Sequence, residues 1–163
     1  MTYLFSKSLG ENPQTTITVN TSVQTTPTSG NSYVTVNGSQ TTYTPAANTD
    51  KVVYEIGFYV EALNKASFQH LILEHDTNNN NTWSTISQNF GKNFGAFGAG
   101  QYLRDYLYYR FIIPSWSGTR GLRLRSSAHT AIHGVNYHAV TEWDGSGSIT
   151  NRFCNTSLLI YSV

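Results

Sequence analysis

The fold of this chain is decided by residues 52–61, which read VVYEIGFYVE. Apolar side chains occupy every second position of this stretch, namely Val52, Tyr54, Ile56, Phe58 and Val60. The other positions carry Val53, Glu55, Tyr59 and Glu61. A period of two predicts a β-strand with one face in the core. The second face exposes Tyr59 beside Val53 and needs cover, which a closed cyclic oligomer supplies.

Further stretches with the same alternation lie on both sides of this strand. We expect strands at residues 17–20, 33–36, 42–44, 68–75, 83–87, 106–113, 122–126, 135–142 and 154–161. Asn37-Gly38 predicts a hairpin turn between the second and third of these. Only residues 61–67 (EALNKAS) have the composition of a helical turn. Many short strands without a long amphipathic helix predict an all-β sandwich, jelly roll or barrel.

Composition limits the class of protein. The 163 residues correspond to one domain, and ten Lys and Arg against nine Asp and Glu give a net charge of +1. Only 12% of residues are charged, about half of the usual share, which argues against a nucleic-acid partner. The single cysteine excludes an internal disulfide framework. No run of about 18 apolar residues and no signal-peptide pattern is present, so we expect synthesis in the cytoplasm and no membrane partner.

We divide the chain into a Thr/Ser-rich N-terminal arm, residues 1–32, and a jelly-roll domain, residues 33–163. Thirteen of the 21 threonines lie in residues 1–50, which is not a core-forming composition. The arm must therefore pair with its own domain or with a neighbouring chain. The alternation at residues 16–19 suits the addition of a strand to an exposed sheet edge. Four residues are accordingly candidate partner contacts: Thr16, Ile17, Thr18 and Val19.

Histidines are the first candidates for chemistry. Three pairs have short spacings: His129 with His133, His133 with His138, and His70 with His75. In strands or the connections between them these spacings hold the side chains too far apart for one ion. A metal site is better explained by three copies of one histidine, one from each subunit, on the axis of a symmetric oligomer than by histidines of a single chain. We expect no metal within one chain and no cofactor.

Catalytic arrangements are not evident. Cys154 falls within the expected terminal strand, where a buried thiol acts as a small hydrophobic side chain. Glu55 and Glu61 share one strand face, but six residues separate them by about 20 Å, too far for a glycosidase pair. The sequence therefore indicates a protein that is not an enzyme.

Residues 90–102 read FGKNFGAFGAGQY and superficially resemble a phosphate-binding loop. They lack both the Gly-x-Gly-x-x-Gly spacing and a Gly-Lys-Ser/Thr ending. Two interpretations remain open for Phe90, Phe94 and Phe97. The rings contact a protein partner, or they close one end of the sandwich.

Six arginines lie in the last 60 residues: Arg104, Arg110, Arg120, Arg123, Arg125 and Arg152. Arg123 and Arg125 alternate with leucines, which places both on one face of a strand. Pairing across subunits with Glu55 or Glu61 is at least as well supported as binding of an external anion. Three tryptophans beside turns suit either stacking on a sugar or the edge of the core: Trp83, Trp116 and Trp143.

Three stretches carry a family resemblance, namely VTVNGS at residues 34–39, TYTP at residues 42–45 and KVVYEIGF at residues 51–58. They resemble an opening module of virion structural proteins of tailed bacteriophages, notably phages of marine cyanobacteria. The following HD, Asn run and TW at residues 75–83, together with SLLIY at residues 157–161, resemble a tumour-necrosis-factor-like jelly roll. The resemblance covers residues 33–163 and implies a trimer with its last strand near the three-fold axis.

The resemblance implies a non-enzymatic protein of the virion. We expect a homotrimeric decoration protein outside the major capsid shell, because 163 residues leave no room for a fibre shaft. The alternative is a receptor-binding or glycan-binding knob of a tail or head fibre. The expected partners are further copies of the chain, the major capsid protein or another virion protein, or a host glycan. The candidate trimer interface comprises Val53, Glu55, Tyr59, Tyr108, Arg110 and Tyr161.

Overall fold

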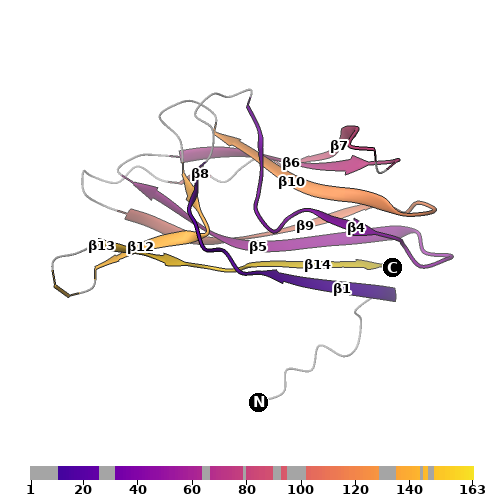
Figure 1. Cartoon of the computed structure of the whole chain (residues 1–163). Helices are drawn as coiled ribbons and strands as arrows, with labels where there is room; N and C mark the ends of the chain where they lie inside the picture. Colours follow the sequence, from indigo (N-terminus) through magenta and orange to yellow (C-terminus); the bar gives the residue numbers. More distant parts are fainter. Residues whose placement is uncertain are drawn as a thin grey trace, which may run out of the picture.

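The computed structural model describes residues 11–25, 32–63, 67–78, 80–89, 93–94, 102–128, 135–143, 145–146 and 149–163. These residues form strands and turns and contain no helix. Two antiparallel sheets face each other, with β5, β9 and β14 in one layer and β6, β7 and β10 in the other (Figure 1). The all-β sandwich expected from the sequence is therefore confirmed.

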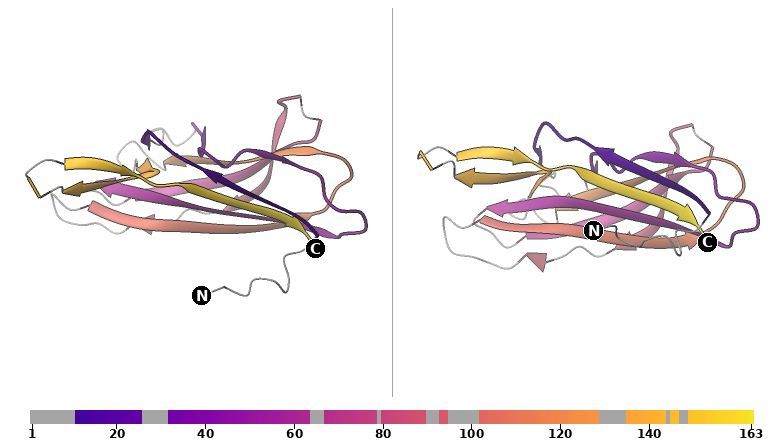
Figure 2. Two further views of the ribbon diagram at one scale, coloured as in Figure 1. Left: turned by 60° about the horizontal axis from the view of Figure 1, so that its bottom comes forward. Right: turned by 90° about the horizontal axis from the view of Figure 1, so that it is seen from below.

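The first sheet is built around β5 (Lys51–Leu63). Its neighbours on one side are β14 (Thr156–Ser162) and then β1 (Glu11–Thr18). The strand β9 (Tyr102–Pro114) pairs with the whole length of β5 on the other side. Figure 2 shows β1 and β14 running side by side next to β5. Two short strands, β11 (Asn136–Tyr137) and β2 (Gln24–Thr25), continue the sheet beyond the end of β14.

The second sheet is built around β10 (Arg120–Ala128) and β6 (Ser67–Asp76). β7 (Trp83–Asn89) and β8 (Asn93–Phe94) pair with β6, while β3 (Val34–Thr35) and β4 (Thr41–Tyr43) pair with β10. A separate hairpin joins β12 (Ala139–Trp143) to β13 (Ile149–Phe153). The order of the long strands in the two sheets is jelly-roll-like.

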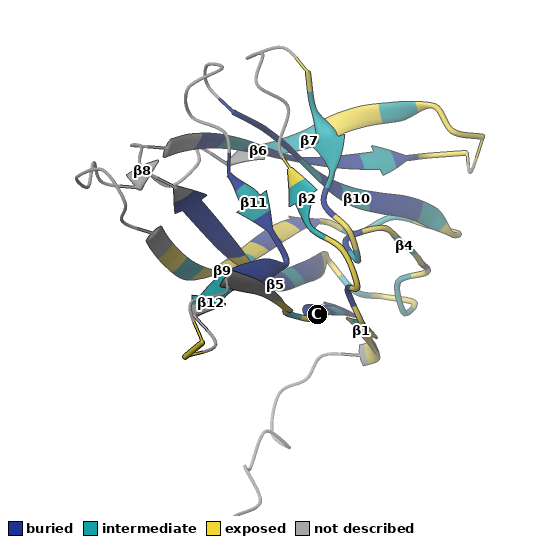
Figure 3. Ribbon diagram, turned by 60° about the vertical axis from the view of Figure 1, so that its left-hand side comes forward, coloured by how far each residue is buried: buried dark blue, intermediate teal, exposed yellow. Residues whose placement is uncertain are grey.

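The core lies between the two sheets, where buried residues face one another (Figure 3). The five apolar positions predicted from residues 52–61 are each fully buried there. One of these five, Tyr54, and also Tyr137 bury a phenol hydroxyl, and each hydroxyl has a hydrogen-bond partner. Tyr54 donates to the Ser39 carbonyl, and Tyr137 bonds with Ser126. Burial raises the pKa of both phenols, so both remain neutral in the core.

The hairpin predicted at Asn37-Gly38 is wrong. Gly38 does form a turn, with φ of 79°, but β3 and β4 both pair with β10 and not with each other. The turn packs against the end of the first sheet, where a side chain on Gly38 would lie 2.7 Å from Thr18. Tertiary pairing with β10 therefore overrides the local turn signal.

Two further strand predictions differ from the structure. The strand expected at residues 135–142 breaks at His138, whose φ of 65° ends β11 and lets β12 enter the separate hairpin. Cys154 lies between β13 and β14 and is half-buried, so its assignment to a buried strand position is wrong. Residues 61–63, expected as the start of a helical turn, continue β5.

The described part of the arm pairs with its own domain. β1 joins the first sheet along β14, with Thr16 opposite Leu158 and Thr18 opposite Thr156. β2 pairs with β11 in the same sheet. Strands from both sides of residue 32, the predicted end of the arm, therefore belong to the same sheet.

Candidate interaction surface

The first sheet turns one side away from the second sheet, and we call this side the outer face. The register of β5 with β14 and β9 fixes which residues share it, because side chains directly opposite one another point the same way. Val53 lies opposite Tyr161 and Ile112. Glu55 lies opposite Leu159 and Arg110, Gly57 opposite Ser157 and Tyr108, and Tyr59 opposite Tyr106. All six predicted trimer-interface residues therefore lie on the outer face. Two of them, Val53 and Tyr161, are nevertheless buried by neighbouring side chains of the same chain, at 1% and 6% exposure, so the expectation that Val53 is exposed is wrong.

An ion pair lies at the centre of the outer face. The Arg110 Nε atom is 3.1 Å from Glu55 Oε1, and Arg110 Nη2 donates to the Tyr161 hydroxyl at 3.0 Å. Tyr161 in turn donates to Glu55 Oε1 at 3.2 Å. Burial and the neighbouring Glu55 carboxylate raise the pKa of Tyr161, and the same causes raise the pKa of Tyr108 to about 12. The centre is therefore charge-balanced, and its phenols remain neutral at physiological pH.

Large side chains around this ion pair remain exposed to solvent. Tyr108 is 56% exposed and Ile112 59% exposed, and Tyr59 and Tyr106 are also exposed. The rings of Tyr59 and Tyr106 pack edge to face with centroids 5.0 Å apart. Exposed aromatic and aliphatic side chains that share one face in this way are typical of an interaction site.

Gly57 allows Tyr106 to lie flat on the outer face. A Cβ atom at Gly57 would lie 1.8 Å from the Tyr106 hydroxyl oxygen, so this position accepts no side chain while the ring is there. The Tyr106 hydroxyl bonds with the Ser157 hydroxyl at 3.1 Å. Tyr106 and Ile112 were not among the residues singled out from the sequence. Their signal was present, because they continue the alternation through Tyr108 and Arg110.

The predicted partner contacts on the arm lie on β1 and just after it. Ile17 lies opposite Ser157, on the outer face, and is 64% exposed. Thr16 and Thr18 point to the other side of the sheet, because they lie opposite the buried Leu158 and Thr156. Val19 follows β1 and is 71% exposed. Ile17 and Val19 therefore present an apolar margin at the edge of the sheet.

The predicted phenylalanine contacts fall largely outside the described residues. Phe90 and Phe97 lie there, and Phe94 belongs to β8, for which only the backbone is described. Neither interpretation of these rings is tested by the structure.

His138 is fully buried within the first sheet, next to Gln24 of β2. Its Nε2 atom is 3.0 Å from Gln24 Oε1, which also accepts the Asn37 N–H. Because this oxygen only accepts, Nε2 carries the hydrogen, and Nδ1 accepts from the Thr156 hydroxyl at 3.1 Å. Thr156 Oγ1 in turn accepts from Asn20. Burial lowers the pKa of His138 to about 4, so the ring is a neutral structural group.

The other histidines do not assemble a metal site in the described part of the chain. His70 and His75 lie on β6 opposite Ser127 and Leu122, and their odd spacing points them to opposite faces. His129 and His133 lie outside the described residues. No group of three or more His, Cys, Asp or Glu side chains suited to an ion occurs among the described residues.

Arginines pair with carboxylates inside the chain. Besides Arg110, Arg104 lies 2.9 Å from the buried Glu61 carboxylate. Arg123 and Arg125 lie on one face of β10, as predicted, and both contact Glu74, at 2.7 and 3.3 Å. The carboxylates Glu55 and Glu61, expected as partners across subunits, thus have arginine partners within one chain.

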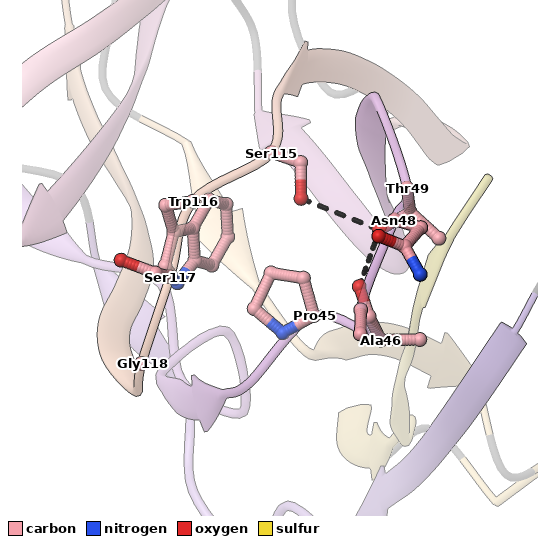
Figure 4. Close-up of a pocket in the computed structure, with 9 residues that line it drawn as sticks. Pro45, Ala46, Asn48, Thr49, Ser115, Trp116, Ser117 and Gly118 are labelled. Carbon is pink, nitrogen blue, oxygen red and sulfur yellow. Dashed lines mark hydrogen bonds between the residues drawn. The ribbon is translucent and has the colours of Figure 1, made fainter.

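A shallow hollow of about 510 Å³ lies between the turn at residues 45–49 and the turn at residues 115–118 (Figure 4). Thr49 joins the two turns, since its hydroxyl donates to the Ala46 carbonyl at 2.8 Å and lies 3.4 Å from the Ser115 hydroxyl. The Trp116 ring packs edge to face on Tyr43 at 6.3 Å. Trp116 therefore anchors the end of the core, which is one of the two roles expected for the tryptophans.

Comparisons with known proteins give no assignment. No protein-family model matches the chain, and no curated protein matches it. Within the part of the chain that the structure describes, no helix is long and apolar enough to cross a membrane. The outer face of the first sheet is therefore the feature from which function must be argued.

Proposed function

We propose that this protein is a non-enzymatic structural protein of a phage particle, a homotrimeric decoration protein bound to the outside of the major capsid shell. The observation that carries the proposal is the outer face of the first sheet. It combines exposed Tyr59, Tyr106, Tyr108 and Ile112 with charges that are already paired. The resemblance of residues 33–163 to virion proteins and to trimeric jelly rolls supports the same assignment.

Self-association suits this surface better than a strongly charged partner does. Arg110 and Arg104 are neutralised by carboxylates of their own chain, so neither arginine is an unpaired charge for an external anion. The chain carries a net charge of only +1, so copies repel one another weakly. Among the described residues β9 pairs only with β5, and an open strand edge of this length is a hazard that a closed oligomer covers.

The contact with the capsid is assigned to the β1 margin. Ile17 and Val19 are exposed there, separated by β14 from the aromatic surface over β5 and β9. The trimer contact and the shell contact thus involve different strands of one sheet. The alternative, a knob of a tail or head fibre, is distinguished by copy number, since a decoration protein is present in hundreds of copies per particle.

Light scattering coupled to size-exclusion chromatography tests the trimer. Ile112→Asp adds a charge to the outer face, and we expect it to lower the measured molar mass from that of a trimer to that of a monomer. Ser84→Asp adds the same charge to an exposed position of β7 in the second sheet and is the matched control. A wild-type monomer at micromolar concentration refutes the trimer.

Co-sedimentation with undecorated capsids tests the shell contact. Val19→Asp is expected to leave the trimer intact and to abolish attachment. Full attachment by this variant contradicts the role of the β1 margin. Absence of wild-type attachment, together with about a dozen copies per particle, favours the fibre knob.

A further inference from the structure

A second concave site lies on the opposite side of the molecule from the outer face. Four residues line up across the second sheet on its solvent side, on four neighbouring strands: Trp83 on β7, Asp76 on β6, Gly121 on β10 and Thr42 on β4. They line a groove of about 370 Å³. Gln40, Thr41 and Asn81 complete its lining. This volume lies within the range of small-molecule sites.

Gly121 makes the hollow, and Trp83 makes one wall. A Cβ atom at Gly121 would lie 3.0 Å from the tip of the indole ring, so Trp83 extends across the sheet toward the bare backbone at Gly121. The Arg123 guanidinium lies 4.0 Å from the centre of the indole and is held 2.7 Å from Glu74. This stacking fixes the orientation of the ring before any ligand arrives.

Asp76 gives the groove a fixed acceptor. It is only 3% exposed, and its two carboxylate oxygens accept the N–H groups of Asn78 and Asn81, at 3.2 and 2.6 Å. Each carboxylate oxygen has capacity for more than one hydrogen bond. The turn that follows β6 thus holds the carboxylate in place.

The rest of the lining is polar and uncharged. Gln40 and Asn81 contribute amides, which both donate and accept, and Thr41 and Thr42 contribute hydroxyls. A groove with one aromatic wall, one oriented carboxylate and several neutral polar groups fits a small ligand that has an apolar face and many hydroxyls. A pyranose ring has this structure.

We propose that this groove binds a pyranose unit of a neutral saccharide. The C–H face of the sugar packs on Trp83, and its hydroxyls donate to Asp76 and exchange hydrogen bonds with Gln40 and Asn81. Anionic sugars are disfavoured, because the Asp76 carboxylate repels a second negative charge. This site is independent of the trimer contact, which lies on the other sheet.

The proposal is tested by titrating the full-length protein with methyl glycosides of glucose, galactose, mannose and N-acetylglucosamine, using saturation-transfer NMR and calorimetry. We expect at least one glycoside to bind with a Kd of about 1 mM or tighter. We expect Trp83→Ala to weaken that binding about tenfold through loss of the aromatic wall. Trp116→Phe alters the tryptophan of the hollow in Figure 4 and is the matched control, with unchanged affinity.

Two variants keep the test decisive if Trp83→Ala unfolds. Gly121→Ala puts a methyl group on the floor of the groove, 3.0 Å from Trp83, and Gln40→Ala removes an exposed amide. Both are expected to weaken binding while the thermal midpoint and the oligomeric state stay unchanged. Binding of none of the four glycosides, equal loss in Trp116→Phe, or tighter binding of methyl glucuronide than of methyl glucoside overturns the proposal.

Discussion

The buried His138 makes the stability of this protein dependent on pH in a defined window. An imidazole in an unfolded chain has a pKa near 6.5, and burial lowers the pKa of His138 to about 4 in the folded protein. Between these two values the unfolded state binds a proton that the folded state excludes. The stabilisation is therefore complete above about pH 6.5 and is lost as the pH falls toward 4.

The magnitude follows from the two pKa values. At pH 4.5 the difference in protonation amounts to about 2.5 kcal/mol of lost folding free energy relative to pH 7. His138→Asn is the informative variant, because asparagine tolerates the φ of 65° at this position and does not titrate. It also removes packing against Phe58, so we expect lower stability than wild type at pH 7.

Urea denaturation at pH 7 and pH 4.5, at one protein concentration, measures the effect. The loss of unfolding free energy on acidification should be about 2.5 kcal/mol smaller in His138→Asn than in the wild type. All other side chains are the same in both proteins, so their contributions cancel in this comparison. Equal losses in the two proteins refute the assignment of His138 as a buried neutral group.

Three further outcomes are expected. Gly38→Ala should lower the free energy of unfolding by about 2 kcal/mol or more, because the φ of 79° disfavours a side chain and the new Cβ would lie 2.7 Å from Thr18. Gly118→Ala is the control, with φ of 78° and no atom within 4 Å of the new Cβ, and it should show only the backbone cost of the positive φ. Glu74→Ala should cost about 2 kcal/mol in chemical denaturation, because it leaves the partly buried Arg123 without its carboxylate, and an unchanged midpoint contradicts this. A chelator should leave the thermal midpoint and the oligomer unchanged, and a drop of more than about 4–8 °C shows a metal site.

The part of the fold that could be predicted from the sequence is the part set by period-two alternation. Residues 52–61 specify both the core side and the outer face of β5, so the alternation alone assigns Val53, Glu55 and Tyr59 to one surface. Tyr108 and Arg110 follow by the same rule on the neighbouring strand. The six residues predicted for the trimer interface share a face for this reason.

The parts that could not be predicted depend on register and on unusual backbone conformations. The Asn37-Gly38 signal is local, whereas the pairing of β3 and β4 with β10 is set by strands distant in sequence. His138 adopts a positive φ, which cannot be predicted from its residue type. The groove proposed to bind a saccharide joins Trp83 to Gly121 only through the register of β7, β6 and β10.

The solvent-facing sides of the two sheets carry different arrangements of charged side chains. This difference supports a different proposed role for each side. On the first sheet Glu55 and Arg110 neutralise each other among exposed tyrosines, which lowers the cost of covering that side with another copy of the chain. On the second sheet Glu74 faces two arginines, and one of these holds the Trp83 ring. That side carries several charged side chains, and its groove has an aromatic wall, which suits a small polar ligand better than a protein partner. A trimer closed through the first sheet would therefore leave its three grooves open to solvent.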